Sequence, residues 1–194
     1  MLPPVYLLPG WQDSGPAHWQ SLWAQRHGDQ RVEQDDWWQP RRGDWMARLD
    51  EVLAGDGRLA EAPALLVAHS LGCHLVAAWA AHSRHRSRVA GALLVAPPDT
   101  ARDDFPPQLH SWRAAVRQPL PFAAVAVLSR DDPFADFAAG EALARDWGAS
   151  VLDAGARGHL NSDSGLGDWP EGRALLTWLA APRATDAARP ERSP

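Results

Sequence analysis

The sequence predicts an α/β fold, a three-layer αβα sandwich in which about six mostly parallel strands lie between two layers of helices. Along the chain, short runs rich in branched apolar residues alternate with stretches that have helical spacing. This alternation is typical of parallel strands joined by crossover helices. Most of the strand-like runs are also apolar almost without interruption, as expected for strands that are covered on both faces.

Six segments have the length and composition of strands. The second of them is polar and weak, so we expect it at an edge of the sheet. The six segments are Val5–Leu8, Arg31–Gln34, Ala64–Ala68, Val89–Ala96, Ala123–Leu128 and Ser150–Asp153.

Five segments between and after these strands have helical character. The first follows Ser14-Gly15-Pro16, in which a capping serine and a proline suit the start of a helix. The segment from Pro97 to Pro121 has no strand pattern, and we expect a short helix in it at Ser111–Val116. Because this segment spans only about 25 residues, it predicts at most a short lid and no cap domain. The five helices are expected around Trp19–Trp23, Trp45–Leu53, Leu71–Ala81, Phe137–Trp147 and Pro170–Leu179.

Length and composition indicate one domain of ordinary globular character. The 194 residues are 45% hydrophobic and 22% charged, a balance that allows a sizeable buried core. We expect the domain to span residues 1–181. The remaining segment, 182–194, has three prolines, mixed charge and no periodicity, and is therefore predicted to be disordered.

Composition argues against several classes of partner. A net charge of −5 gives no basic surface for nucleic acid, and no apolar run approaches the roughly 18 residues that a membrane span needs. No secretory signal precedes the first Pro-Gly turn, so we expect a cytoplasmic protein. All 19 basic residues are Arg, which excludes a lysine Schiff base and a P-loop. Cys73 is the single cysteine, so no disulfide can form within the chain.

The stretch ALLVAHSLGCHLVAAWAA, from Ala64 to Ala81, is an apolar strand followed directly by a helix, with Ser70 at the junction. A sharp strand-to-helix turn of this kind, the nucleophile elbow, holds a serine hydroxyl above the end of the sheet. The turn requires small residues two positions on either side of the serine. Ala68 and Gly72 occupy these positions, so the motif is A-x-S-x-G in place of G-x-S-x-G.

A serine hydroxyl is a poor nucleophile unless a base, usually a histidine held by a carboxylate, takes its proton. In hydrolases with this elbow, the acid and then the histidine follow the serine, each on a loop after a strand. Here Asp131 and Asp132 follow the strand AAVAVL, and His159 lies on the loop after the next strand. The order predicts a triad of Ser70, His159 and one of the two aspartates, which these residues alone leave open.

Each of these residues also has a structural interpretation: a helix cap for Ser70, an ordinary turn for Asp131-Asp132-Pro133 and a solvated loop residue for His159. Three such residues in the required order, each after its own strand, favour the catalytic interpretation. The other histidines lie too close to the serine along the chain, or away from the strand ends. His82 and His85 lack acidic or cysteine neighbours, so we expect no metal site.

Taken together, these motifs resemble those of the small α/β-hydrolases typified by retinoblastoma-binding protein 9 and its bacterial YdeN-like relatives. The similarity extends over nearly the whole chain, through VYLLPGWQDSGPAHWQ, VAHSLGC, GALLVAPPD, SRDDPF and GHLN. The resemblance implies a serine hydrolase with a minimal α/β-hydrolase fold, without the first two strands of larger hydrolases and without a cofactor. It also implies a triad of Ser70, Asp132 and His159, and so favours Asp132 over Asp131.

Further residues are expected to complete the site. The N–H of Leu71, at the start of a helix, and the N–H of Trp11, in the turn after the first strand, are the candidates for an oxyanion hole. Trp37 and Trp38, after the second strand, are candidates for an aromatic acyl pocket, whereas most of the eleven tryptophans are expected in the core. The expected substrate is a small-molecule ester, thioester or amide, bound in an open, shallow site and cleaved through an acyl-enzyme.

Two other functions belong to different classes. One is a non-catalytic protein-interaction module that retains the hydrolase fold, although such a module would not need a complete triad. The other is a flavodoxin-like binding domain, which would need a phosphate-binding loop after the first strand, where Trp11 leaves little room. The sequence favours the serine hydrolase over both and indicates no particular protein partner.

Overall fold

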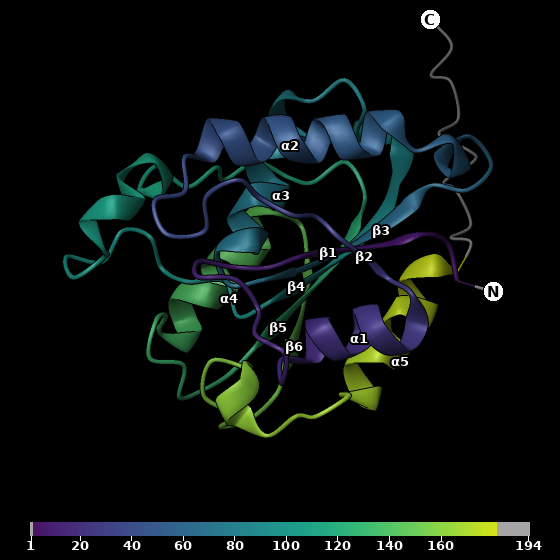
Figure 1. Ribbon diagram of the computed structural model, residues 1–194. Helices are drawn as coiled ribbons and strands as arrows, with labels where there is room; N and C mark the ends of the chain where they lie inside the picture. Colours follow the sequence, from purple (N-terminus) through teal and green to yellow (C-terminus); the bar gives the residue numbers. More distant parts are fainter. Residues whose placement is uncertain (1, 182–194) are drawn as a thin grey trace, which may run out of the picture.

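A computed structural model describes residues 2–181 and contains one six-stranded sheet in which every pair of neighbouring strands is parallel (Figure 1). The strand order is β2-β1-β3-β4-β5-β6, so the predicted parallel α/β sheet is confirmed. The segment 182–194, for which the sequence predicts disorder, lies outside the described residues. The strands are β1 (Val5–Leu8), β2 (Gln30–Arg31), β3 (Ala64–His69), β4 (Val89–Val95), β5 (Ala123–Leu128) and β6 (Ser150–Asp153).

The helices cover both faces of the sheet and make the three-layer arrangement visible in Figure 1. Helices α1 (Trp19–His27) and α5 (Pro170–Ala180) lie on one face. The opposite face carries α2 (Arg42–Gly55), α3 (Leu71–His82) and α4 (Phe137–Asp146). Short 3-10 turns complete the described elements: Gly57–Ala60, Arg86–Arg88, Pro107–Trp112 and Ser162–Ser164.

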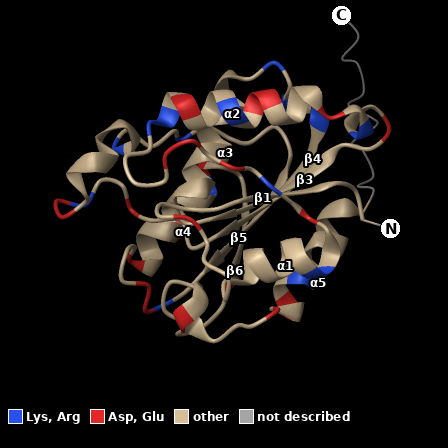
Figure 2. Ribbon diagram, in the orientation of Figure 1, with Lys and Arg blue, Asp and Glu red and all other residues tan. Residues whose placement is uncertain are grey.

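Alternate residues of each central strand enter different hydrophobic clusters. In β1, Val5 and Leu7 pack with the α1 and α5 side, whereas Tyr6 and Leu8 pack with the α2 and α3 side. Side chains in a strand alternate between the two faces of the sheet, so a strand covered on both faces must be apolar throughout. Figure 2 shows the consequence: β1, β3, β4 and β5 carry no charged residue. The charged residues lie in helices, in loops and, as Arg31 and Asp153, on the edge strands β2 and β6.

Buried tryptophans also fix the loops. Six indoles are almost fully buried, as expected for most of the tryptophans of this chain. Each donates its indole N–H to an oxygen outside its own helix or turn, which satisfies the polar edge of an otherwise apolar ring. The pairs are Trp19 with the Leu160 carbonyl, Trp23 with Asp168, Trp45 with Asp36, Trp79 with the Asp50 carboxylate, Trp112 with Pro40 and Trp147 with Val116.

Two local expectations are revised by the structure. The weak second strand does lie at the sheet edge, but it is only two residues long and ends at Arg31 instead of continuing to Gln34. The helix predicted at Ser111–Val116 is instead a 3-10 segment at Pro107–Trp112. A proline at its first position starts this segment earlier than the apolar pattern indicates. In the described residues, the β4–β5 connection contains no other helix, so no cap domain is present there.

The strand order places the loops after β1 and β3 next to each other. From β1 the chain moves outward to β2, and it then returns to the other side of β1 to form β3. The connection after β1 leads to β2 on one side, and the connection after β3 leads to β4 on the other side. A crevice therefore forms between the carboxyl ends of β1 and β3, which is where ligands of open α/β sheets bind.

Gly72, two residues into α3, lets this helix approach the end of β1 closely. A Cβ atom at Gly72 would lie 2.3 Å from the Leu8 carbonyl oxygen and 2.9 Å from the Pro9 carbonyl oxygen. Both contacts are with backbone, which cannot move without disturbing the sheet. The small residue expected after the serine is therefore required by the packing of α3 against β1.

No helix within residues 2–181 is long and apolar enough to cross a membrane.

We predict that Gly72→Ala lowers the free energy of unfolding by about 1–3 kcal/mol, because the added methyl overpacks the junction of α3 with β1. Gly43→Ala, also near the start of a helix, is the matched control, since a Cβ there meets nothing within 4 Å. The control is expected to be neutral or slightly stabilising. Urea denaturation of the three proteins measures the difference, and equal stabilities for the two variants would contradict this account of Gly72.

Candidate active site

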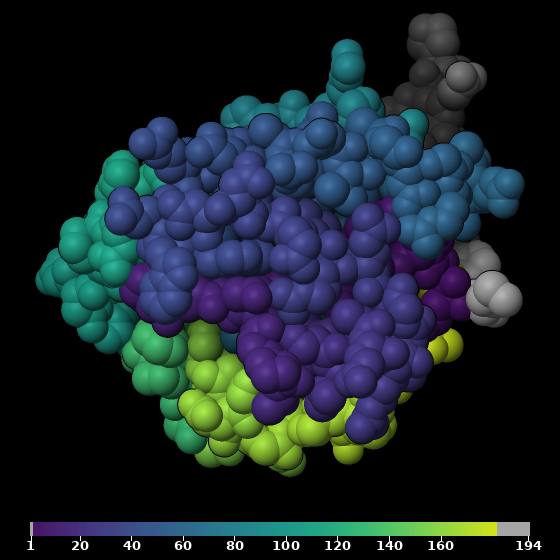
Figure 3. All heavy atoms as spheres, in the orientation of Figure 1, coloured from purple at the N-terminus to yellow at the C-terminus, as the bar shows by residue number. Residues whose placement is uncertain are grey.

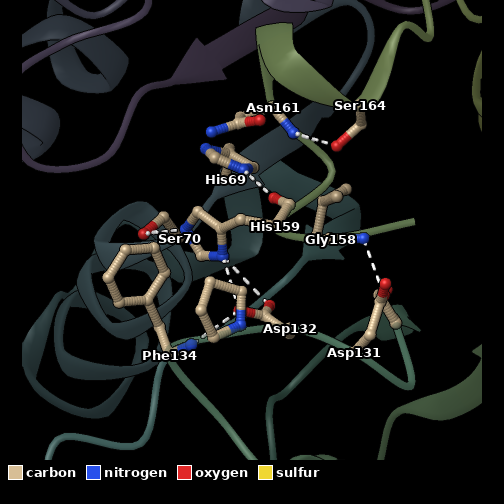
Figure 4. Close-up of polar contacts among 12 residues, drawn as sticks. His69, Ser70, Asp131, Asp132, Phe134, Gly158, His159, Asn161 and Ser164 are labelled. Atoms are coloured by element: carbon tan, nitrogen blue, oxygen red, sulfur yellow. Dashed lines mark hydrogen bonds and ion pairs between the residues drawn. The ribbon is translucent and has the colours of Figure 1, made fainter. Parts of the chain in front are cut away.

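Ser70 lies in the sharp turn between β3 and α3 with φ 54° and ψ −124°. A positive φ is uncommon for a residue with a side chain and is held only where the surrounding structure requires it. The Ser70 side chain makes no capping hydrogen bond to α3, so the helix-cap interpretation does not describe it. Its Oγ instead lies 2.9 Å from Nε2 of His159 (Figure 4).

The loop after β1 passes directly against Ser70. A Cβ at Gly10 would lie 2.7 Å from the Cβ of Ser70 and 3.2 Å from its Oγ, so only glycine fits at this position. Ala68, the departure from the strict elbow motif, is fully buried in the same apolar cluster as Leu8. The strand side of the elbow therefore accommodates a methyl group, whereas Gly72 on the helix side accommodates none.

His159 connects Ser70 to Asp132. Both carboxylate oxygens of Asp132 lie 3.0 Å from Nδ1 of His159, and the side chains of both residues are at least nine-tenths buried. A carboxylate can only accept, so the ring proton lies on Nδ1 and Nε2 is free to accept from the Ser70 hydroxyl. Figure 4 shows the three side chains in line, from β3–α3, β6–α5 and β5–α4.

Asp131 has a different partner from its neighbour. Its Oδ1 accepts hydrogen bonds from the backbone N–H of Gly158 at 2.7 Å and from the Ser129 hydroxyl at 2.8 Å. These contacts, the Gly158 N–H first, hold the pKa of the Asp131 carboxyl below its usual value. The sequence motif did not decide which of the two aspartates contacts His159. In the structure, Asp132 contacts the His159 ring, and Asp131 contacts the backbone next to it (Figure 4).

The loop that carries His159 is held in an unusual conformation from several sides. Gly158 and Leu160, on either side of the histidine, both have positive φ, 57° and 50°. The Leu160 carbonyl accepts from the indole N–H of Trp19 at 2.9 Å, and the His159 carbonyl lies 2.9 Å from Nε2 of His69. Because a carbonyl only accepts, His69 donates this bond. Helix α1 and the elbow thus both fix the position of His159.

His69 is a buried neutral histidine beside the base. Burial, and to a smaller degree the charges of His159 and His18, lower its pKa well below the usual value. Its ring centroid lies 4.9 Å from that of His159, and Phe134 contacts His159 with ring centroids 4.6 Å apart. Phe134 is 52% exposed, so it shields the base at the surface. Sequence reasoning set His69 aside as a base and missed its contact with the His159 loop.

The two expected oxyanion donors both line the cavity at Ser70. Leu71 is the first residue of α3, where a backbone N–H has no partner within the helix. The N–H of Trp11 lies in the turn after β1, where Gln12 and Asp13 have positive φ, and no described residue accepts a hydrogen bond from it. Both N–H groups are therefore available to a bound substrate.

Trp37 and Trp38 are not brought into the cavity. Trp37 packs against Trp45 in the core, and Trp38 is 64% exposed. Their carbonyls instead hold the turn after β1: Gln12 N–H donates to the Trp37 carbonyl and the indole of Trp11 to the Trp38 carbonyl, both at 3.0 Å. Strand β2 ends at Arg31, and the chain that follows it runs beside the turn after β1. The carbonyls of Trp37 and Trp38 therefore face this turn.

The cavity has a volume of about 430 Å³, within the range of small-molecule sites. Its apolar wall comes mainly from residues that the sequence did not single out, on the β4–β5 connection and the loop after β5. Figure 3 shows the N-terminal segment, in purple, as a band between the blue residues of the α2 region and the green to yellow C-terminal third. The apolar lining residues are Trp11, Leu71, Pro98, Phe105, Pro106, Leu109, Pro133 and Phe134.

Comparison with solved structures defines the class of fold. A YdeN-like protein from Pectobacterium atrosepticum superposes with a TM-score of 0.77 and 26% identity, over 91% of this chain and 90% of its own. YdeN of Bacillus subtilis gives a TM-score of 0.68 with 23% identity, over 91% and 97%. The esterase RhEst1 from Rhodococcus gives 0.63 with 17% identity, over 91% and 90%. The fold is thus a minimal α/β-hydrolase fold, as the resemblance implies.

Sequence comparison identifies the family. The curated protein YdeN of Bacillus subtilis is 27% identical over 184 residues, which cover 89% of this chain and 94% of YdeN. The family model described as serine hydrolase matches residues 5–178. The chain therefore belongs to the serine hydrolase family and groups with its YdeN-like members, and the flavodoxin-like alternative is set aside.

His18 and His74 are two of the buried histidines that make stability depend on pH. Burial is the main factor that lowers the pKa of His18 and of His74 from 6.5 to about 4. Between these values the unfolded chain binds protons that the folded protein does not bind, so stability falls as the pH falls. We predict a loss of about 1.5 kcal/mol for each histidine between pH 6.5 and pH 5.

Urea denaturation at pH 6.5 and pH 5 measures this loss. His18→Asn removes one titrating group and is expected to reduce the loss by about 1.5 kcal/mol. His27→Asn, at an exposed position of the same helix, serves as the control. A loss of the same size in wild type and His18→Asn would show that His18 is not held neutral by burial.

Proposed function

We propose that this protein hydrolyses small carboxylic esters through an acyl-enzyme on Ser70, with His159 as the general base and Asp132 as the group that orients it. The proposal rests on one observation, the unbroken chain of hydrogen bonds from Ser70 Oγ through His159 to the Asp132 carboxylate. Such a chain activates a hydroxyl that is otherwise a weak nucleophile. Membership of the serine hydrolase family supports the same chemistry.

Acylation begins when the Ser70 oxygen attacks the ester carbonyl carbon while His159 Nε2 takes the hydroxyl proton. Asp132 stabilises the imidazolium that forms. The negative charge that develops on the carbonyl oxygen is held by the N–H groups of Leu71 and Trp11, the first of which also benefits from the positive end of α3. The bond to the leaving oxygen then breaks, and His159 returns the proton to the departing alcohol.

Deacylation repeats these steps with water. His159 takes a proton from the water that attacks the acyl carbon, the bond to Ser70 breaks, and the proton returns to the serine oxygen. The products are the carboxylic acid and the free enzyme. Apart from this water, every group that takes part in the proposed steps belongs to the chain or to the substrate.

The apolar wall of the cavity supports an uncharged acyl group of modest length. Phe105 and Leu109, on the β4–β5 connection, are buried and line the cavity together with Leu71. Transfer of an acyl chain from water to such a surface contributes about 0.8 kcal/mol for each buried methylene. An ester is favoured over an amide because an alcohol leaves more readily than an amine.

Loss of the nucleophile is the first test. We predict that Ser70→Ala lowers kcat/KM for p-nitrophenyl esters of two to eight carbons by at least about 10⁴-fold, and that it abolishes labelling by a fluorophosphonate probe. A protein-interaction module with the hydrolase fold would give neither turnover nor labelling in the wild type. Equal turnover by wild type and Ser70→Ala would exclude the proposed mechanism.

The two neighbouring aspartates give a matched second test. Asp132→Asn is expected to lower kcat by about 10³–10⁴-fold, because the amide stabilises neither the required tautomer nor the imidazolium. Asp131→Asn is expected to cost no more than about tenfold, because its amide oxygen still accepts from the Gly158 N–H. Steady-state kinetics with one ester compare the two variants. A larger loss in Asp131→Asn would assign the orienting role to Asp131 instead.

A further inference from the structure

The cavity at Ser70 has a polar part as well as an apolar one. Its apolar residues come largely from the β4–β5 connection, which also contributes Asp99, Arg102 and Asp104 to the lining. Further polar residues come from the β1–α1 loop and from the β6–α5 loop that carries His159. Apart from His159, the polar lining residues of these two loops are Gln12, Asp13, His18, Asn161 and Ser162.

Among these, His18 has a buried nitrogen without a partner. The residue caps α1: its Nδ1 lies 3.2 Å from the backbone N of Gln20, which donates to it. Only 4% of His18 is exposed, and its Nε2 has no hydrogen-bond partner within residues 2–181. A buried polar atom of this kind is rare in a folded protein and calls for an explanation.

The protonation state of His18 follows from its surroundings. Burial, then the charge of His159 and that of the Arg31 guanidinium, lower its pKa to about 4, so the ring is neutral near pH 7. Because Nδ1 accepts from Gln20, the single ring proton lies on Nε2. His18, a lining residue of the cavity, therefore carries a hydrogen-bond donor on Nε2 whose direction is fixed by the cap on α1.

His18 lies on the same side of the cavity as His159, with the His69 ring between the two. Its ring packs against His69 with centroids 4.7 Å apart, and His69 packs against His159 at 4.9 Å. In the proposed reaction, His159 protonates the leaving oxygen, so the leaving group must lie beside this histidine. The acyl group and the oxyanion are bound elsewhere, by the apolar wall and by the N–H groups of Leu71 and Trp11.

We propose that His18 determines leaving-group specificity by donating a hydrogen bond from Nε2–H to an oxygen of the departing alcohol. The preferred substrates are then esters whose alcohol carries a second oxygen, as an ether or hydroxyl, a few bonds from the ester. This assignment rests on the proposed esterase function and narrows it. An alcohol without such an oxygen leaves the buried donor unpaired, and the site discriminates against it for that reason.

Two esters that differ in a single atom test the proposal. In 2-methoxyethyl butyrate an ether oxygen occupies the place of a methylene in n-butyl butyrate, while the acyl group is the same. The measured quantity is the ratio of kcat/KM for the two esters, followed by titration of the butyric acid released. The different intrinsic reactivities of the two alcohols cancel when this ratio is compared between variants.

His18→Asn is the informative variant. Asparagine is a good helix cap, so its side chain can replace Nδ1 as the acceptor for Gln20, but it is too short to replace the Nε2–H donor. His18→Ser also keeps a helix cap, and it shows whether an effect seen in His18→Asn is caused by the asparagine side chain itself. His27→Asn, an exposed change on the same helix, is the control.

We expect the ratio to fall about five- to tenfold in His18→Asn and His18→Ser, with the loss confined to the methoxyethyl ester, and to stay unchanged in His27→Asn. An unchanged ratio in both His18 variants would overturn the assignment, as would an equal loss for the two esters, which indicates a structural role. Failure of the wild type to hydrolyse either ester would overturn the esterase function itself, a result that is distinct from turnover with an unchanged ratio.

Discussion

The close approach of α3 to the end of β1 is the constraint on which the rest of the site depends. Gly72 allows α3 to start against the carbonyls of Leu8 and Pro9, and Gly10 allows the following turn to pass against Ser70. A side chain at either position would separate the elbow from the turn that carries the Trp11 N–H. Ser70 and the N–H groups of Leu71 and Trp11 therefore owe their relative positions to two close approaches that only glycine allows, and the positive φ of Ser70 is maintained by this packing.

His159 is positioned by a separate set of contacts. Its loop is tied to α1 through the Trp19 indole, to the elbow through His69, and to the β5–α4 loop through both aspartates. Of the two adjacent aspartates after β5, Asp132 thus holds the ring of His159 and Asp131 holds the backbone of the neighbouring Gly158. This arrangement explains why a loop with several residues of positive φ can present an imidazole to Ser70 at hydrogen-bonding distance.

The sequence predicts those parts of the fold and site that follow from strand ends. Ser70 directly follows β3, and Asp132 and His159 lie on the loops after β5 and β6. The carboxyl ends of parallel strands share one edge of a sheet. The residue pattern could not show which of Asp131 and Asp132 contacts the His159 ring. Both lie on one loop, and only the path of that loop decides which carboxylate reaches the ring. Trp37 and Trp38 follow a strand, yet their carbonyls and not their rings face the site. Phe105 and Leu109 lie on a connection without periodicity, so nothing in the sequence marked them.

The indole of Trp19 links the core to the site in a way that can be observed optically. It donates to the Leu160 carbonyl, beside His159, and it packs against His18, Trp23 and Trp169. Any displacement of the catalytic loop must break this bond and change the polarity around a cluster of three fluorophores. The intrinsic emission of the protein is therefore a label-free reporter of loop opening, built from residues that also hold the loop closed.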